Sequence, residues 1–453
     1  MLDNYPEILG VEKGLTQPSA LKIIARVKSY NPTAKIKEYE GKPSEIYEMP
    51  SVAEGYSQER PRWEAAKKAL ILREKKARPN YGNLRFVHVF VSDEKAQEDY
   101  SFVVSMENEC PYRCEMCYLQ SSLKGAPVPT IFTNLQEDGL LLREIKIALL
   151  AMHMHTQTHS VKNNIGRVEQ RWVHLLMGVL NKALPDKLLD IPIQKIFADN
   201  IKSIKQAVQS SGLDVLTPIY DKLNEFSFKK TERSFKFSCG ELGDGLANDH
   251  FTKNSKFIVE LFSTEVMQND GAILVLTSKS DNISIIKQAI PIPNIIIAIT
   301  IGTPKYVIGP PTITRRLEAA QSLLILGFNI QISIDPIVFG NSTIQTYKRV
   351  LDKIANTLDH TNDHLVGLTL GMLRFGEKNL TENIQERHLD LYHHVREQMT
   401  RPHGEEKYRY EYSERVKVYR ELVDHSKSIM PGVKIRLSTE AISVWKDVGL
   451  SWE

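Results

Sequence analysis

The chain is 453 residues long, with 42% hydrophobic and 25% charged residues and a formal net charge of +3. This length supports a full hydrophobic core, as one large domain with an insertion or as two domains, and so small a charge does not by itself indicate a nucleic-acid partner. The first residues contain no apolar signal segment, and the most apolar run, residues 295–300, is far too short to cross a bilayer. Four cysteines do not make a disulfide framework. We therefore expect a cytoplasmic protein with no membrane partner.

The first hundred residues have a mixed α/β pattern. Residues 62–78 show helical periodicity with one basic face, which could contact phosphates or could simply be solvated. Residues 83–92 and 100–106 alternate like strands. The second of these strands leads directly into a cluster of cysteines.

Three of the four cysteines, Cys110, Cys114 and Cys117, lie within eight residues. The C-x3-C-x2-C spacing lets one short loop direct three thiolates at a single centre. A structural zinc site needs four ligands, so zinc would require a histidine as well. A [4Fe–4S] cluster usually has four cysteine ligands, and three leave one iron open. The spacing resembles that of the radical S-adenosylmethionine (SAM) enzymes, in which SAM occupies that iron and is cleaved to a 5′-deoxyadenosyl radical.

Residues 140–232 are predicted to be a helical insertion, because helical segments follow one another with little strand signal. Within it, His153, His155 and His159 suggest a second metal site. No cysteine or carboxylate follows them at ligand spacing, so exposed histidines on a helix are the preferred interpretation.

After residue 232, strand-like and helical runs alternate, which predicts a parallel α/β sheet or barrel. Such folds gather functional residues at the carboxyl ends of their strands. Five chemically interesting residues follow strand-like runs in this way: Cys110, Cys239, Lys279, Thr300 and Asp335.

Two further features admit two interpretations each. Tyr408, Tyr410 and Tyr412 would share one face of a strand and form a stacking surface edged by positive charge, or they belong to an ordinary half-buried strand. Arg374 follows a strand-like run and could bind an anionic group of substrate or SAM, or pair with a carboxylate.

Several segments resemble spore photoproduct lyase, the radical SAM family that splits the thymine dimer of spore DNA. The resemblance covers most of residues 60–139 and 233–437. Its segments occur in the same order as in that family: "CEMCYLQSSLKGAPVPTIFTNLQEDGLL", "FKFSCGELGDGLANDHFT", "LVLTSKSDNISII", "RRLEAAQSLLILGFNIQISIDPIV" and "EKYRYEYSERVKVYRELVDHSKSIMPGVKI".

The resemblance implies a role for each matching residue. The [4Fe–4S] ligands would be Cys110, Cys114 and Cys117, and the SAM contacts would be Gly240, Glu241, Lys279 and Thr300. Cys239 matches the thiol that returns a hydrogen atom to the product radical, although a free cysteine is also a common small core residue. Tyr118 is retained beside the last cluster cysteine. The implied partners are lesion-containing DNA and an external electron donor such as flavodoxin or ferredoxin.

The sequence departs from the family at Met116, where the lyase has a tyrosine that relays hydrogen, and at Glu405 and Glu406, in the region of its basic hairpin. Two alternatives therefore stand beside a lyase acting on a DNA lesion. One is a radical SAM enzyme acting on a peptide or small molecule. The other is a non-catalytic, metal-stabilised protein that binds nucleic acid.

The fold expected from the resemblance is a partial (β/α)6 barrel of the TIM type with additions. It begins with an N-terminal α/β extension (residues 1–98), followed by the start of the barrel with the cluster loop (99–139) and the helical insertion (140–232). The rest of the barrel (233–400) and a C-terminal substrate-contacting strand and helix (401–453) complete the chain.

Overall fold

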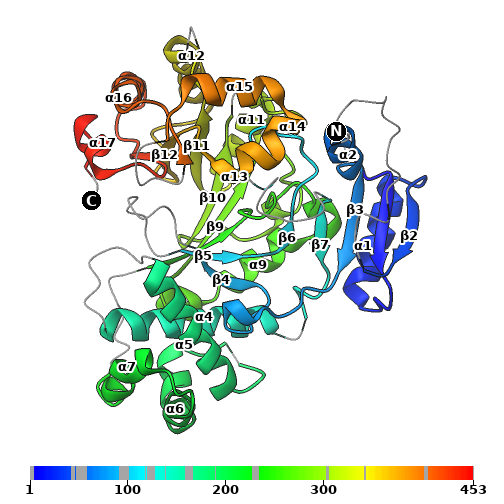
Figure 1. Ribbon diagram of the computed structural model, residues 1–453, viewed down its shortest axis with the longest axis vertical. Coiled ribbons are helices and arrows are strands. Elements are labelled where there is room, and N and C mark those ends of the chain that lie inside the picture. The colour runs from blue at the N-terminus through cyan, green and yellow to red at the C-terminus, as the bar shows by residue number, and fades with distance from the viewer. Residues whose placement is uncertain are drawn as a thin grey trace.

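The computed structural model describes most of the chain in ordered segments, which are residues 5–41, 46, 59–90, 101–117, 119, 128–137, 139–158, 167–188, 190–226, 234–302, 306–340, 343–401 and 407–451. Their strands form an eight-stranded sheet, a five-stranded sheet and a two-stranded ribbon. Figure 1 shows the small sheet beside the large one, with helices above and below the large sheet.

The large sheet is parallel except at one edge, where β4 and β5 are antiparallel. In spatial order its strands are β15 (Ile435–Leu437), β12 (Leu365–Met372), β11 (Asn329–Ile337), β10 (Ile295–Thr300), β9 (Ala272–Ser278), β8 (Phe235–Cys239), β5 (Ser101–Val104) and β4 (Val87–Phe90). The alternation of strands and helices predicted a parallel α/β fold, and this prediction is confirmed. From β8 to β12, neighbours in the sheet are also successive strands of the sheet along the chain.

Strand register gives the large sheet two different faces. Phe237 pairs with Leu274, and Ile297 with Ile330, on a face that is fully buried. Helices cover this face, and Phe262 of α9 (Asn254–Phe262) meets the ring of Phe237 at 5.4 Å between centroids. The opposite face carries half-buried polar side chains at the intervening positions, among them Ser238, Thr277, Gln331, Ser333 and Thr369.

Helices alternate with or follow these strands. The long ones are α11 (Ile313–Ile325), α12 (Thr343–Thr357), α15 (Leu389–Gln398) and α16 (Tyr412–Ile429), and shorter ones are α8 (Asp249–Thr252), α10 (Glu265–Asn269), α13 (Glu377–Asn379), α14 (Gln385–Arg387) and α17 (Ile442–Asp447). The ribbon pairs β13 (Phe375–Gly376) with β14 (Lys407–Tyr408). Among the described residues, no helix has both the length and the apolar character needed to cross a membrane.

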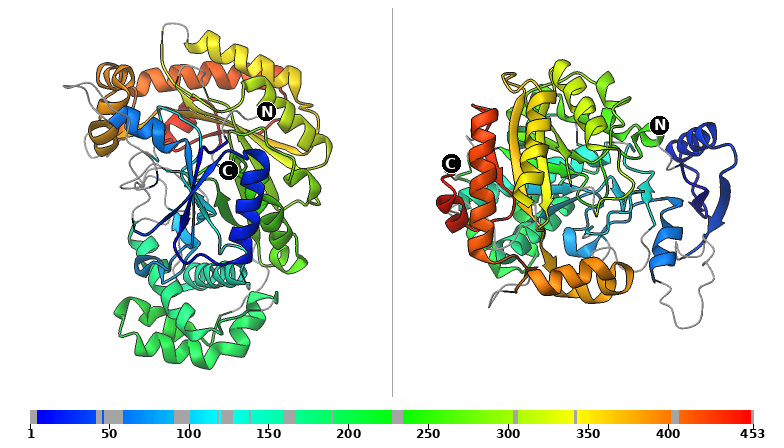
Figure 2. Two further views of the ribbon diagram at one scale, coloured as in Figure 1. Left: turned by 90° about the vertical axis from the view of Figure 1, so that its right-hand side faces the viewer. Right: turned by 90° about the horizontal axis from the view of Figure 1, so that it is seen from above.

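The small sheet has the order β2 (Lys35–Tyr39), β1 (Ile8–Glu12), β3 (Ala69–Arg73), β7 (Thr130–Phe132) and β6 (Glu107–Asn108), accompanied by α1 (Pro18–Tyr30) and α2 (Glu59–Ala66). Figure 2 shows α1 and β2 at one side of the molecule and α16 at the other. Because β6 and β7 flank the cysteine loop in the sequence, this sheet supports that loop directly.

Between β7 and β8 the described chain is helical, with α4 (Leu140–Thr158), α5 (Arg167–Ala183), α6 (Ile193–Ser210) and α7 (Thr217–Lys222). Buried charges fix α4 to the sheet. Lys146 Nζ lies 2.9 Å from Asp270 Oδ2, and the Glu144 carboxylate accepts hydrogen bonds from three successive backbone N–H groups, those of residues 85–87. The exposure expected for the helix histidines is wrong, since His153 and His155 are buried. His159 lies outside the described residues.

Two other local predictions are wrong for the same reason, which is that tertiary packing overrides local periodicity. Residues 62–78 are not one helix, because α2 ends at Ala66 and the buried β3 follows it to pair with β1. The basic face expected there does not form, since Lys67 and Lys75 are buried. The three alternating tyrosines are also not on one strand: β14 ends at Tyr408, and Tyr412 begins α16.

Lys75 is unusual because it is a lysine buried in the core. Its Nζ is buried without a hydrogen-bond partner among the described residues and lies 4.1 Å from the centre of the Phe132 ring. Burial, with a further contribution from the Arg78 guanidinium, lowers the pKa of Lys75 to about 7. On folding, this amine must either give up its proton or stay charged in apolar surroundings, and each of these lowers the stability of the fold.

Replacing Lys75 by methionine should stabilise the fold, most strongly at neutral or lower pH. The unfolded amine takes up a proton below its ordinary pKa of about 10.5, whereas the folded one does so only near 7. The cost of the lysine thus grows as pH falls from about 10.5 to 7 and stays constant below 7. We expect Lys75→Met to gain roughly 2 kcal/mol or more in urea unfolding at pH 6.5, because each pKa unit is worth about 1.4 kcal/mol, and much less at pH 9.5.

The exposed neighbour provides the control, since Lys76→Met should change stability little at either pH. If the stability gained from Lys75→Met is the same at pH 6.5 and 9.5, the pKa of Lys75 is not lowered in the folded protein.

Candidate active site at the carboxyl ends of the strands

The cysteine loop begins after β6 and lies at the carboxyl ends of the large sheet. Cys110, Cys114 and Tyr112 are buried in one small cluster with Ala247, and the half-buried Cys117 packs against it. All three cysteines are free thiols. The loop thus brings its three cysteines together in one small, mostly buried cluster.

Backbone hydrogen bonds hold the loop against two strand-end segments. The Glu109 N–H donates to Leu242 O at 2.6 Å, in the segment that follows β8. The Arg113 and Glu115 N–H groups donate to Ile308 O at 2.8 Å and to Tyr306 O at 3.0 Å, in the segment after β10. The structure thus joins segments that are distant in the sequence.

Charged side chains hold the loop from the outside. Lys67 Nζ lies 2.6 Å from Glu109 Oε2 and donates to Cys110 O at 3.0 Å, and both side chains of this ion pair are almost fully buried. Glu115, between Cys114 and Met116, lies 3.8 Å from Arg60 Nη2. It also lies 3.6 Å from Nδ1 of His388, a neutral ring because burial lowers its pKa to about 3. The loop is therefore clamped between α2 and the start of α15.

The three cysteines supply soft sulfur donors of the kind that bind iron–sulfur clusters, and burial governs their ionisation. Burial raises the pKa of Cys110 and Cys114, and it raises that of Cys117 to about 12. Buried thiols of this kind are neutral unless a cation stabilises the thiolate, as bound metal does. Within the described part of the chain, no three His, Cys, Asp or Glu side chains are close enough to one another to hold a metal ion, so the loop has the donors without the closed ligand geometry.

Gly240 and Glu241 form the turn that leaves β8. Gly240 has φ of +96°, and a Cβ there would lie 2.2 Å from Thr277 O, so only glycine fits. Glu241 is half-buried, and its Oε1 accepts a hydrogen bond from Ser238 Oγ at 2.8 Å. The carboxylate thus stands on the polar face of the sheet.

Asp244, which sequence reasoning missed, ties this turn to the end of β9. Its carboxylate accepts hydrogen bonds from Ser278 Oγ at 2.5 Å and from the Lys279 N–H at 2.6 Å, as well as from two N–H groups of its own loop. The Asp244 N–H in turn donates to Glu107 Oε1 at 2.7 Å, just before the cysteine loop. The only sequence signal was an aspartate four residues beyond a glycine turn, which is too common to interpret.

Glu107 is buried under the same loop. It also accepts from Asn248 Nδ2 at 3.0 Å, and a Cβ on Gly243 would lie 2.6 Å from its carboxylate. Burial raises the pKa of Glu107 to about 8. The segment 240–248 is therefore packed directly on β6, which brings the turn after β8 to the cysteine loop.

Lys279 and Thr300 complete the row of strand ends. Lys279 is half-buried just beyond β9, and its charge lowers the pKa of Cys114, whose main shift is a rise caused by burial. Thr300 is the last residue of β10, and its carbonyl accepts a hydrogen bond from the buried Arg316 of α11. Lys279 thus lies within electrostatic reach of Cys114, and Thr300 is on the neighbouring strand.

Cys239 ends β8 on the buried face that it shares with Phe235 and Phe237, and its neighbours in register are Val104 and Leu276. It is fully buried, and burial raises the pKa of its thiol. This environment is the one that a packing role requires. Tyr118 lies outside the described residues, and Met116 is buried in the main core.

Parallel strands with a free-cysteine loop at their carboxyl ends define an α/β protein whose site lies at the strand ends. Solved structures show the particular fold. The chain is similar to spore photoproduct lyase complexed with dinucleoside spore photoproduct, with a TM-score of 0.60 and 16% identity over 96% of this chain and 99% of that one. A variant of the lyase with bound AdoMet (SAM) and dinucleoside spore photoproduct is similar with a TM-score of 0.57 and 15% identity, over 95% of this chain and 98% of that one.

The fold of this chain is therefore that of spore photoproduct lyase, as the sequence resemblance predicted. No family model matches the chain, and no curated protein matches its sequence.

Asp244→Asn tests whether this carboxylate holds the strand ends. The amide can accept on only one of its two atoms, so at least one charge-assisted hydrogen bond is lost, and we expect the free energy of unfolding to fall by roughly 2 kcal/mol. Urea unfolding measures the change. The exposed Asp363→Asn serves as control, and equal stability of the two variants would contradict the role given to Asp244.

Proposed function

We propose that this chain is a radical SAM enzyme that repairs a thymine-dimer-type lesion in DNA. The observation that carries the proposal is the cysteine loop: residues 110–117 have the spacing of a three-cysteine cluster site, and the N–H groups of Glu109, Arg113 and Glu115 join the loop to the strand-end segments after β8 and β10. This cysteine loop belongs to a chain with the fold of a lyase whose solved complexes contain AdoMet and dinucleoside spore photoproduct.

In this proposal Cys110, Cys114 and Cys117 hold a [4Fe–4S] cluster. When bound, the cluster and SAM would supply the electron and the 5′-deoxyadenosyl radical, and the protein orients them and excludes water. Soft thiolate ligands suit iron–sulfur clusters, and the burial of the loop provides the dry surroundings that such chemistry needs.

The SAM contacts proposed here stand on three adjacent strand ends. Glu241 would accept a hydrogen bond from the amino group of SAM, and Lys279 would pair with its carboxylate. Thr300 would add a polar contact. Asp244 acts through Lys279, because it fixes the backbone from which the lysine side chain extends.

The wider assignments follow from the same resemblance. We infer that the strands from β5 to β12 form a partial (β/α)6 barrel, with residues 1–98 and 140–232 as additions and residues 401–453 contacting substrate. We infer a cytoplasmic enzyme that receives electrons from a donor such as flavodoxin or ferredoxin.

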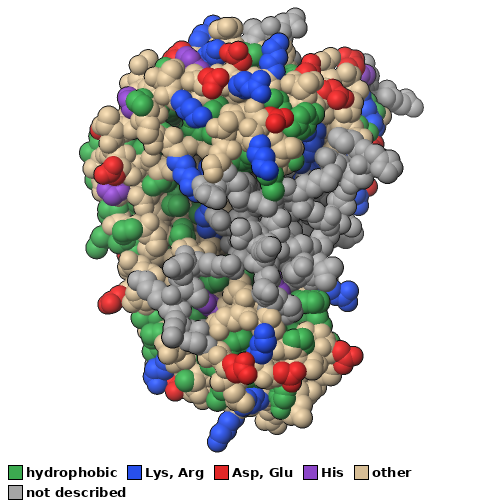
Figure 3. Space-filling model, turned by 90° about the vertical axis from the view of Figure 1, so that its left-hand side faces the viewer, with side chains coloured by type: hydrophobic (Ala, Val, Ile, Leu, Met, Phe, Trp, Pro, Cys, Tyr) green, Lys and Arg blue, Asp and Glu red, His purple; other side chains and the backbone are tan. Residues whose placement is uncertain are grey.

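Two observations favour a second candidate, a radical SAM enzyme acting on a peptide or small molecule. Met116 is buried in the core at the position where the lyase has its relay tyrosine. Among the described residues of the face shown in Figure 3, Lys and Arg side chains are interspersed with Asp and Glu.

Single Cys→Ala variants at positions 110, 114 and 117 test the cluster. The anaerobically reconstituted parent should bind about four irons per chain and cleave SAM to 5′-deoxyadenosine under a strong reductant, whereas each variant should lose cleavage. Iron and sulfide assays are the second readout, and they separate an iron–sulfur enzyme from a zinc-stabilised binding protein. Full cleavage by any one of the variants would refute the assignment.

Cys239→Ala and Cys239→Ser test the hydrogen donor. Radical formation does not need this thiol, so both variants should keep the iron and still form 5′-deoxyadenosine. A lesion-derived radical that lacks its S–H donor should be trapped as an aberrant adduct, and serine should not rescue it because an O–H bond is harder to break homolytically. If mass spectrometry finds parental products from both variants, Cys239 is a packing residue.

A further inference from the structure

Arg316 is a buried arginine in the first turn of α11. Its guanidinium donates a hydrogen bond to the carbonyl of Thr300, the last residue of β10. The segment between β10 and α11 also holds the cysteine loop, because Ile308 O accepts a hydrogen bond from the Arg113 N–H at 2.8 Å. Helix α11 therefore begins a few residues beyond the segment to which the cysteine loop is bonded.

The charge of Arg316 has no acidic partner in contact. The residue is 3% exposed, and among the described residues its Nε has no hydrogen-bond partner and its guanidinium forms no ion pair. The carboxylate of Asp281 is instead paired with Arg315 Nη2 at 2.5 Å, and that of Asp244 is bonded to the end of β9. Burial lowers the pKa of Arg316 in spite of the negative charges around it, yet a guanidinium keeps its proton in proteins. Arg316 is therefore a buried positive charge.

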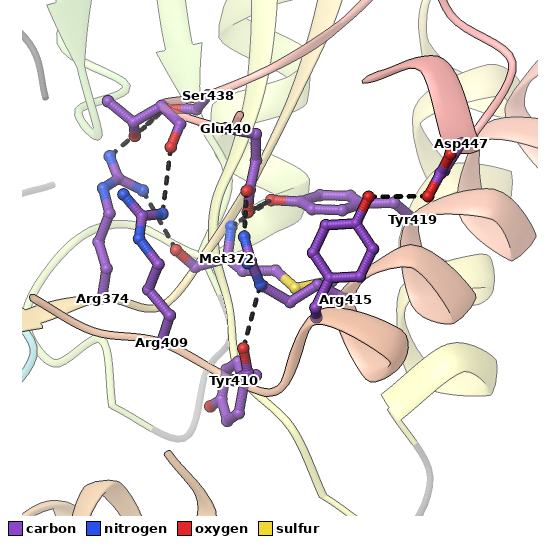
Figure 4. Close-up of polar contacts among 11 residues, drawn as sticks. Met372, Arg374, Arg409, Tyr410, Arg415, Tyr419, Ser438, Glu440 and Asp447 are labelled. Carbon is purple, nitrogen blue, oxygen red and sulfur yellow. Dashed lines mark hydrogen bonds and ion pairs between the residues drawn. The ribbon is translucent and has the colours of Figure 1, made fainter. Parts of the chain in front are cut away.

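Other buried cations of this protein do contact a carboxylate. The Arg415 guanidinium contacts the Glu440 carboxylate, which also accepts a hydrogen bond from the Tyr419 hydroxyl at 3.2 Å (Figure 4). The side chains of Arg415 and Glu440 are 8% and 2% exposed, and the ion pair between α2 and the cysteine loop is of the same kind. A buried charge without a partner lowers the stability of a fold. The position of Arg316 thus calls for an anion that the polypeptide itself does not supply.

The cysteine loop is where such an anion would form. Burial raises the pKa of Cys114, and the positive charges of Lys279 and Arg316 are among those that oppose the rise, so Arg316 is within electrostatic reach of this sulfur. Three thiolates around a [4Fe–4S] cluster carry three negative charges against the double positive charge of the oxidised core. The loaded loop is therefore negative overall, and one-electron reduction makes it more negative.

We propose that Arg316 is the built-in counter-charge of the iron–sulfur cluster and favours its reduction. This inference rests on the proposed function and adds to it a residue that sets how readily the cluster accepts its electron. A low-potential one-electron donor gives the cluster one electron, and no bond forms or breaks in that step. The fixed positive charge of Arg316 stabilises the reduced form more than the oxidised form, because the reduced form is the more negative.

Two other cations near the loop are less suited to this role. Lys67 is paired with Glu109 at 2.6 Å, so the pair adds little net charge. Lys279 is half-buried and pairs with the SAM carboxylate in the proposed function. Water and salt screen an exposed charge more than a buried one. Arg316 is buried, lacks an ion-pair partner among the described residues and is fixed by its bond to Thr300.

Arg316→Gln and Arg316→Lys separate the charge of this residue from its hydrogen bond. Both new side chains can donate to the Thr300 carbonyl, but only lysine keeps the charge. The measurement is an anaerobic redox titration of the reconstituted protein without SAM, followed by electron paramagnetic resonance of the reduced cluster. Arg316→Gln should make reduction about tenfold less favourable, which is a potential about 59 mV more negative. Arg316→Lys should stay near the parental potential, as should the control Arg349→Gln, which removes an exposed charge on α12.

The metal-free protein provides a test of opposite sign. Its buried cysteines are neutral thiols, so Arg316 is there a buried charge without a counter-anion, and Arg316→Gln should raise the urea midpoint of unfolding above that of the metal-free parent. A residue that only packs α11 against β10 would instead lower this midpoint and leave the potential unchanged.

Three results would overturn the inference: a parental potential in Arg316→Gln, an equal shift in Arg316→Lys, or a metal-free Arg316→Gln protein that is less stable than the parent or unfolded. In each case the parent still holds its iron–sulfur cluster, so the proposed function stands. If the reconstituted parent binds no such cluster, the proposed function fails and the inference fails with it.

Discussion

The carboxylate of Asp244 holds together the strand ends on which the proposed site depends. It fixes Ser278 and Lys279 at the end of β9, and its own backbone is fixed by Glu107 just before the cysteine loop. A buried carboxylate is stable only when its oxygens are hydrogen-bonded, and Asp244 meets this condition with donors at the end of β9 and in its own loop. The glycine turn after β8 therefore has one position relative to Cys110 and its neighbours.

Buried polar groups that are paired also fix α2 and α4 in place. Lys67 and Glu109 form a buried pair between α2 and the cysteine loop, and Lys146 and Asp270 form another between α4 and the turn before β9. Breaking a buried pair leaves an uncompensated charge at high cost. Such pairs give a definite docking geometry to elements that ordinary apolar contacts would orient less strictly.

The sequence was most informative where chemistry and local pattern agree. The parallel sheet and the grouping of the three cysteines could be predicted, because the alternation of strands and helices and the short cysteine spacing are local signals. The strand Ala69–Arg73 was mistaken for helix, because its pairing with β1 is not local. Arg374 pairs with a carboxylate, which was one of its two interpretations, but the identity of that partner, Asp335, and the role of Asp244 could not be predicted, since a single polar residue acquires its partners only from strands that meet in space.

In the proposed function, a radical formed at the cysteine loop acts on a DNA lesion bound at the strand ends. The most direct measurement is anaerobic incubation of the reconstituted protein, SAM and reductant with an oligonucleotide containing one spore photoproduct, followed by mass spectrometry of the digested DNA. The account predicts conversion of the lesion to two thymidines, dependent on SAM. Formation of 5′-deoxyadenosine with the lesion left intact would contradict it and would direct the search to another substrate.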